Sequence, residues 1–331
     1  MQNFNYYPTP EEVEANLAET AEKKKLLRAA IAVTVPCLVF FLVTEFYRQI
    51  VLFIGSSLGF SQEQTLTFLR DPYVLQTVQI AMSLTVIALP FAVCAKIYGF
   101  NISRFAALNR PKSGTLLPYF LFGVGFCAFA NIAVAAAGRV FERFGFKDTG
   151  VKDVNPDGVW GLLLSITATA IVPALVEEFA FRGIVQGILL PFGEAFSVFA
   201  SAAVFGMVHG NFEQIPFAFL VGLVVGFIRI KTGSIAVCMA VHAANNLIAV
   251  LASYPGVLPV AISNIIYTVY VLLALTLSVL GVALIKGEGK FSFSEHSGAL
   301  NAKKRYVGFF FSFPFLAVFM VYLFRAVSRL L

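Results

Sequence analysis

The chain has 331 residues, of which 59% are apolar and only 13% are charged. Soluble proteins average about 45–50% apolar and about 25% charged residues, so the composition argues against an ordinary soluble domain and predicts a polytopic membrane protein. The net charge of +6 is not accompanied by a basic stripe with interleaved aromatic side chains, so we expect no nucleic-acid partner.

The first 25 residues are polar, contain five glutamates and end in the lysines Lys23 to Lys25. Such a segment lacks the apolar stretch and small-residue cleavage site of a secretory signal peptide, so none is predicted. We expect residues 1–28 to form a cytosolic tail that precedes the first membrane-spanning helix.

Stretches of about 20 uncharged residues follow, each long enough to cross a hydrocarbon core of about 30 Å as an α-helix. They predict an all-α transmembrane bundle of eight or nine helices. The segments are 29–54, 73–95, 114–138, 158–190, 195–209, 214–229, 234–252, 258–285 and 306–324. Two of them, 195–209 and 214–229, are short for a full crossing, and we expect them to be tilted, broken or partly buried by neighbouring helices.

Lysine and arginine are concentrated on one side of these spans, which the positive-inside tendency assigns to the cytosol. The clusters are Lys23 to Arg28, Lys96 to Lys112 and Lys286 to Arg305. They place the N-terminus in the cytosol. We expect an integral, multi-pass protein in the plasma membrane of a prokaryote.

A polar loop at 139–158, rich in Asp, Gly and Pro, is the clearest break in composition. We place a boundary there, so that residues 29–157 form the N-terminal transmembrane helices and their connecting loops. Residues 158–252 contain the charged residues and histidines expected to be buried. Residues 253–331 form the C-terminal transmembrane helices.

Three acidic residues interrupt the predicted spans: Glu45, Glu177 and Glu178. An ionised group at the bilayer centre costs about 2.5–3.5 kcal/mol on insertion scales, so such residues normally face a protein interior or a water-filled cavity. Glu45 has a local partner one turn on, Arg48, and Glu178 has Arg182 at i+4. Glu177 has no base at i+3 or i+4. It therefore needs a partner from another helix, as a general base would.

Three histidines are available as partners. His296 lies in a polar loop and is expected to be solvated. His209 ends the motif FGMVH, and His242 shares a helix face with Asn246 in the motif HAANN. At 1.5 Å per residue, Glu177, His209 and Asn246 lie about 20–25 Å from the turns that flank their helices, but His242 lies about 14 Å away. We expect His242 to reach the others only through a tilt or a kink.

A single histidine or asparagine within a membrane more often joins helices by hydrogen bonds than catalyses a reaction. Here, however, the polar residues occur together in less than a quarter of the chain. They resemble the motifs EExxxR, FxxxH and HxxxN of the CAAX-processing and bacteriocin-immunity (CPBP or Abi) family of intramembrane proteases. The motifs read EEFAFR at Glu177–Arg182, FGMVH at Phe205–His209 and HAANN at His242–Asn246. The resemblance covers about residues 155–255 and implies a catalytic helical core.

The resemblance implies an intramembrane endopeptidase that acts on a hydrophobic or lipidated peptide or protein in the membrane, such as a prenylated CAAX protein. Glu177 and His209 would activate water, and His242 and Asn246 would stabilise the oxyanion. Glu178, together with its arginine, would hold these residues in place.

The involvement of a metal is left open by these residues. Glu177, His209 and His242 have the composition of a His₂Glu zinc site, although the chain has no HExxH motif. If all three bound zinc, Glu178 would be the remaining general base, and Arg182 already engages it. We favour a metal-free glutamate mechanism, with zinc as the alternative.

Two other functions compete with the protease. A non-enzymatic immunity or scaffold protein could keep the same fold, and a proton-coupled transporter could use buried Glu and His residues as a relay. The second half of the chain does not repeat the Glu–His–His constellation, which an inverted-repeat transporter often would. The transporter is therefore the weaker alternative.

Overall fold

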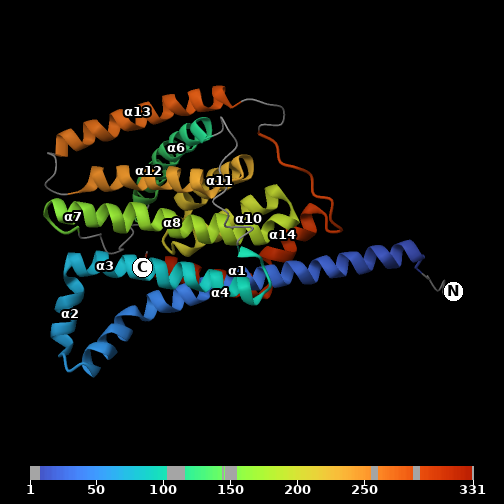
Figure 1. The fold of residues 1–331 in the computed structure, drawn as a ribbon, viewed down its shortest axis with the longest axis horizontal. Coiled ribbons are helices and arrows are strands. Elements are labelled where there is room, and N and C mark those ends of the chain that lie inside the picture. The colour runs from blue at the N-terminus through green and yellow to red at the C-terminus, as the bar shows by residue number, and fades with distance from the viewer. Residues whose placement is uncertain are drawn as a thin grey trace.

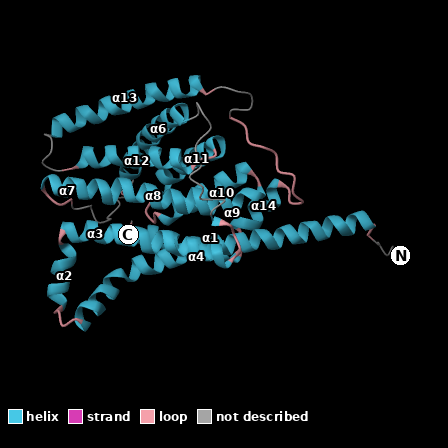
Figure 2. Ribbon diagram, in the orientation of Figure 1, coloured by secondary structure: helices cyan, strands magenta, loops and turns pink. Residues whose placement is uncertain are grey.

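A computed structural model describes residues 8–102, 116–143, 145, 155–254, 260–285 and 291–329. These residues form helices without any strand, packed as a bundle with most axes along one direction (Figures 1 and 2). The α-helices are α1 (Pro10–Ser57), α2 (Gln62–Arg70), α3 (Pro72–Met82), α4 (Leu89–Ile97), α6 (Leu116–Arg143), α7 (Gly158–Ser165), α8 (Val172–Glu178), α9 (Gln186–Leu189), α10 (Glu194–Val208), α11 (Gln214–Thr232), α12 (Ile235–Ser253), α13 (Val260–Leu284), α14 (Ala302–Phe310) and α15 (Phe313–Ser328).

In the described ranges, seven helical segments are long and apolar enough to span a membrane. The pair α14 and α15, bent by 56°, makes an eighth if it is counted as one span. The all-α polytopic bundle is therefore confirmed. The predicted segment 195–209 is helix α10, which is 15 residues long. Part of the evidence for sidedness, namely Arg104, Arg110, Lys112, Lys286 and Lys290, lies outside the described residues, as do residues 146–154 of the polar loop.

Helix α1 begins within the segment expected to be a tail and continues for 48 residues through the first span. Thr9 and Glu12 start it with a capping box, in which each side chain bonds the other residue's backbone N–H. Pro36 lies inside the helix. The N-terminal end of α1 extends beyond the other helices on the right of Figure 1.

The chain that follows α13 packs against this extension of α1. His296 Nε2 and the Leu300 backbone N–H both donate to Glu22, each at 2.9 Å. The His296 side chain is 11% exposed, so the expectation that it is solvated was wrong. A contact between residues 274 positions apart cannot be read from the local polarity of the loop.

A second correction concerns Glu45, which was expected to pair with Arg48 in the next turn. The structure places Arg325 of α15 beside it instead, with Nε 3.8 Å from Glu45 Oε2. Helix α15 packs along α1, so the cation arrives from the other end of the chain. Spacing within one helix could not reveal this partner.

The centre of the bundle is the continuous span Gly158–Phe192, which contains α7, α8 and α9. Two π-helical segments interrupt it, at Ile166–Ile171 and Phe179–Val185. In Figure 1 this span lies between α12 on one side and α4 on the other, and both contact it. The charged motif residues are therefore surrounded by protein.

Helices α6 and α13 pack closely through glycine. A Cβ atom at Gly125 would overlap Ser278 and the backbone oxygen of Ala274, whereas one at Gly138, in the same helix, would meet nothing within 4 Å. We expect Gly125→Ala to destabilise the protein by roughly 1–3 kcal/mol through overpacking. Thermal unfolding of the detergent-solubilised protein measures this. Gly138→Ala is the matched control and should not destabilise, because alanine favours helix. Equal stability of the two variants would contradict the close α6–α13 contact.

Candidate active site

Glu178 is the centre of a buried charged cluster. Its Oε1 accepts hydrogen bonds from Arg182 Nη1 at 2.9 Å and from His242 Nδ1 at 2.8 Å. Glu178 is 0% exposed, Arg182 1% and His242 7%. The ion pair expected from the i, i+4 spacing is therefore present, and His242 of α12 joins it. The cluster fastens α12 to the central span through charge-assisted hydrogen bonds.

The local backbone explains how Arg182 reaches Glu178. Arg182 lies in the π-helical segment that follows Glu178. A π-helix bonds each N–H to the carbonyl five residues earlier, and residues four apart lie on the same side of such a turn, as they do in an α-helix. The guanidinium also lies over the ring of Phe205 in α10, 4.2 Å from the ring centre. This cation–π contact ties a third helix to the cluster.

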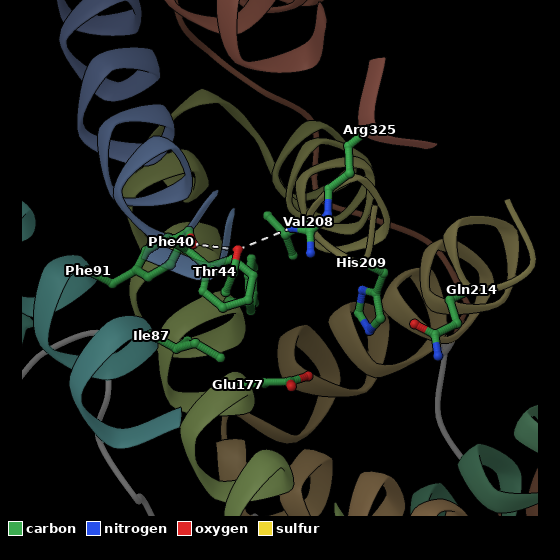
Figure 3. A pocket seen from close by; sticks show the side chains of 10 residues that line it. Phe40, Thr44, Ile87, Phe91, Glu177, Val208, His209, Gln214 and Arg325 are labelled. Atoms are coloured by element: carbon green, nitrogen blue, oxygen red, sulfur yellow. Dashed lines mark hydrogen bonds between the residues drawn. The ribbon is translucent and has the colours of Figure 1, made fainter. Parts of the chain in front are cut away.

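Glu177 has a different environment from Glu178, although the two are adjacent in sequence. Its side chain is 19% exposed and points into a cavity of about 210 Å³ (Figure 3). The polar residues that line this cavity are Thr44, Glu177, His209, Gln214 and Arg325, and the other lining residues are apolar. One glutamate therefore supports the fold while its neighbour is available to a ligand or a water molecule.

His209 lines the same cavity, on the side opposite Glu177's helix (Figure 3). Its Nδ1 lies 2.7 Å from the backbone oxygen of Phe205. A carbonyl oxygen only accepts, so Nδ1 carries the hydrogen and Nε2 of the neutral ring holds a lone pair. The Phe205 ring packs edge-on against the imidazole at 4.9 Å and fixes its plane.

His242 comes closer to the glutamates than its position in the helix predicted. Its Nε2 lies 4.0 Å from Glu177 Oε2, while its Nδ1 donates to Glu178. The expected difference in depth assumed a regular α-helix from Glu177 to the turn at Pro191. The intervening π-helical segment advances less along the axis for each residue, which removes part of the expected difference in level between Glu177 and His242.

Asn246, one helical turn after His242, is held by a hydrogen bond to a backbone carbonyl that lacks its usual helical partner. Its Nδ2 donates to the oxygen of Thr169 at 3.1 Å. In an α-helix that oxygen would accept from the residue four positions later, but this residue is Pro173, which has no N–H. Asn245 donates to Asn246 Oδ1 and accepts from Asn131 of α6, each at 3.1 Å. Sequence reasoning missed this network, although the proline was a readable signal of a free carbonyl.

The six predicted site residues are thus not all equally close to one another. Glu178, Arg182 and His242 are in direct contact, and Glu177 lies between His242 and the cavity that His209 lines. Asn246 does not line that cavity. Sequence analysis also missed Thr44, Gln214 and Arg325, which come from helices outside the motifs. For Arg325, the signal was a charge within an apolar C-terminal segment.

The described residues contain no group of three or more His, Cys, Asp or Glu side chains placed to hold a metal ion. Glu177, His209 and His242 are thus not gathered into such a group, although the His242 Nε2 lies 4.0 Å from Glu177 Oε2. Nδ1 of each histidine is bonded to a protein oxygen. The Glu177 carboxylate and the second ring nitrogen of His209 remain available at the edge of the cavity. A carboxylate and an imidazole nitrogen in this position suit proton transfer to and from water.

In a comparison with protein families, residues 159–248 match the family model "Type II CAAX prenyl endopeptidase Rce1-like". Comparisons with curated proteins and with solved structures found no match. The matched range contains all three motifs and the whole charged cluster. Residues 159–248 of this multi-pass membrane protein are a domain of the CAAX-processing (CPBP) family of intramembrane proteases.

Proposed function

We propose that the protein is an intramembrane endopeptidase that hydrolyses a peptide bond of a hydrophobic or lipidated substrate, with prenylated CAAX-type proteins as the first candidates. This proposal is based on the different environments of two adjacent glutamates. Glu178 is fully buried and bonded to Arg182 and His242, whereas Glu177 faces a cavity shared with His209. The family match and the bilayer-spanning helices support the substrate class.

In the proposed mechanism, the Glu177 carboxylate removes a proton from a water molecule in the cavity while the water oxygen attacks the peptide carbonyl. His209 holds this water through the lone pair on Nε2. The proton then passes to the leaving amine as the carbon–nitrogen bond breaks. No step requires a metal ion, because a carboxylate base and hydrogen-bond donors account for each proton and charge.

The oxyanion of the tetrahedral intermediate would be bound by His242 and Asn246. Nδ1 of His242 already donates to Glu178, so donation from Nε2 requires the imidazolium form. That form would have a carboxylate beside each ring nitrogen, Glu178 at 2.8 Å and Glu177 at 4.0 Å. Asn246 uses one amide hydrogen on Thr169 and has a second for the oxyanion, although it does not line the cavity.

We also propose that the N-terminus lies in the cytosol and that the protein resides in the plasma membrane of a prokaryote. The described basic residues Lys23 to Arg28 and Lys303 to Arg305 support this orientation. They lie together at one end of the bundle, where Lys304 Nζ is 2.6 Å from Glu19 Oε2. The positive-inside tendency assigns that end to the cytosol.

The first prediction concerns the general base. Glu177→Gln keeps the size of the side chain but cannot accept a proton, so we expect the cleavage rate to fall by about 10²–10⁴-fold with no loss of thermal stability. The assay is cleavage of a quenched hydrophobic or farnesylated peptide by protein in nanodiscs. Glu63→Gln, on the exposed surface of α2, is the control and should keep wild-type activity. Full activity of Glu177→Gln would refute the mechanism, and inactive wild-type protein would favour the scaffold alternative.

The second prediction separates folding from chemistry. Glu178→Ala leaves the buried Arg182 and His242 without their common acceptor, and breaking a buried ion pair in this way costs about 3–5 kcal/mol. We expect a much lower unfolding temperature than for Glu177→Ala, its neighbour in sequence. Thermal unfolding in the same detergent compares the two. A Glu178→Ala variant as stable as Glu177→Ala would show that the cluster does not support the fold.

The third prediction concerns metal. We expect purified wild-type protein to keep its peptidase rate after treatment with a strong zinc chelator, because the proposed mechanism uses only protein groups. Metal analysis of the same sample is the accompanying measurement. Loss of activity with chelator, followed by recovery on addition of zinc, would replace the glutamate mechanism by the zinc alternative.

A further inference from the structure

Arg325 brings a cation into the candidate active site from α15, which lies beyond the family match. Arg325 lines the cavity that Glu177 and His209 also line, and its side chain points towards them in Figure 3. Its stem rests on Gly210, the residue after His209: a Cβ atom at Gly210 would lie 3.2 Å from Arg325 Cδ. The Arg325 side chain therefore passes directly beside the residue that follows His209.

The protein satisfies only part of the hydrogen-bonding capacity of this guanidinium. Arg325 Nη1 donates to Thr44 Oγ1 at 3.1 Å. Its acidic neighbour, Glu45, has Oε2 3.8 Å from Nε, which is longer than a hydrogen bond, and the Glu45 side chain is 51% exposed. A guanidinium has five N–H donors arranged in a fork that matches a carboxylate. The cavity therefore contains a cation with donors to spare beside apolar walls.

We propose that Arg325 binds the C-terminal α-carboxylate of the peptide substrate and so directs cleavage to a bond near the C-terminus. This inference rests on the proposed endopeptidase function. Arg325 and Glu177 line one cavity of about 210 Å³. An extended residue spans about 3.3–3.6 Å, so only a few residues separate the carboxylate from the scissile bond. The apolar wall receives the intervening side chains.

The apolar walls also agree with this ligand. A substrate tail of aliphatic residues would bury its side chains against Phe40, Ile87 and Phe181, while its only charge meets Arg325. Such a carboxylate would be drawn into a bidentate, charge-assisted pair, which is stronger than a bond between neutral groups. An internal peptide segment, which has no terminal carboxylate, would lack this contact.

The test compares two forms of one peptide. The probe has a fluorophore and a quencher, an S-farnesyl cysteine, two aliphatic residues and a C-terminal residue as either the free acid or the amide. We expect wild-type protein in phosphatidylcholine nanodiscs to show a kcat/KM about 10–100-fold higher for the acid. In Arg325→Gln, the ratio of acid to amide should fall to about one. A wild-type ratio near one, or a high ratio that survives in Arg325→Gln, overturns the proposal.

Two controls exclude a structural role. Arg48→Gln removes an exposed arginine of α1 that does not line the cavity, and the acid-to-amide ratio should remain high. Glu45→Gln removes the acidic neighbour of Arg325 and should also leave the ratio high. If Arg325 only anchored α15 to α1, Glu45→Gln would lower the ratio in the same way as Arg325→Gln, and that result would count against carboxylate binding.

A binding measurement keeps this inference separate from the catalytic proposal. Fluorescence anisotropy of the two peptides with Glu177→Gln protein, in the same nanodiscs, reports recognition without cleavage. Tighter binding of the acid, abolished by adding Arg325→Gln, supports the role of Arg325 even if wild-type protein cleaves neither peptide. Equal binding of acid and amide overturns it, and would also be the result if Arg325 bound a lipid phosphate instead. Cleavage by Glu177→Gln would refute only the proposed mechanism.

Discussion

Glu178 sits where no water can screen it, with Arg182 and His242 on the same carboxylate oxygen. An isolated charge would be strongly unfavourable there, so the three groups stabilise one another only as a set. The set joins the central span to α12, and the contact of Arg182 with Phe205 adds α10. The positions of His209 and His242 relative to Glu177 follow from this junction. Glu178 thus stabilises the packing of the helices, and Glu177 faces the cavity.

Two π-helical segments flank the paired glutamates of the candidate site. The central span departs from α geometry at Ile166–Ile171 and again at Phe179–Val185, on either side of the paired glutamates. Pro173 lies between these segments and removes a donor that the carbonyl of Thr169 would otherwise use. Asn246 takes that place. In a membrane, where backbone groups cannot turn to water, a freed carbonyl of this kind is a fixed point on which a neighbouring side chain can be oriented.

The features that short-range patterns determine could be predicted from the sequence. Apolar runs gave the spans, and the i, i+4 spacing gave the pair of Glu178 and Arg182. The predictions that proved wrong concerned contacts between segments that are distant in the sequence. His296 bonds α1 rather than water, and Arg325 rather than Arg48 approaches Glu45. Such partners depend on how helices pack, which the pattern along one helix does not encode. His242 was expected to need a tilt or a kink to reach Glu177, and the structure has a π-helical segment directly after the paired glutamates, which composition does not signal.

Helix α1 has two attachments that are far apart. Near its start, Glu22 is held by His296 and Leu300, and 22 residues later Thr44 forms part of the cavity wall. At 1.5 Å per residue, about 33 Å of helix separates them. A continuous helix of this length connects the contact at Glu22 with the wall of the cavity, so a displacement at one end is carried along the helix to the other. Pro36 lies between these two points and lacks the backbone N–H of a regular helical residue, so it is the position at which α1 bends most easily.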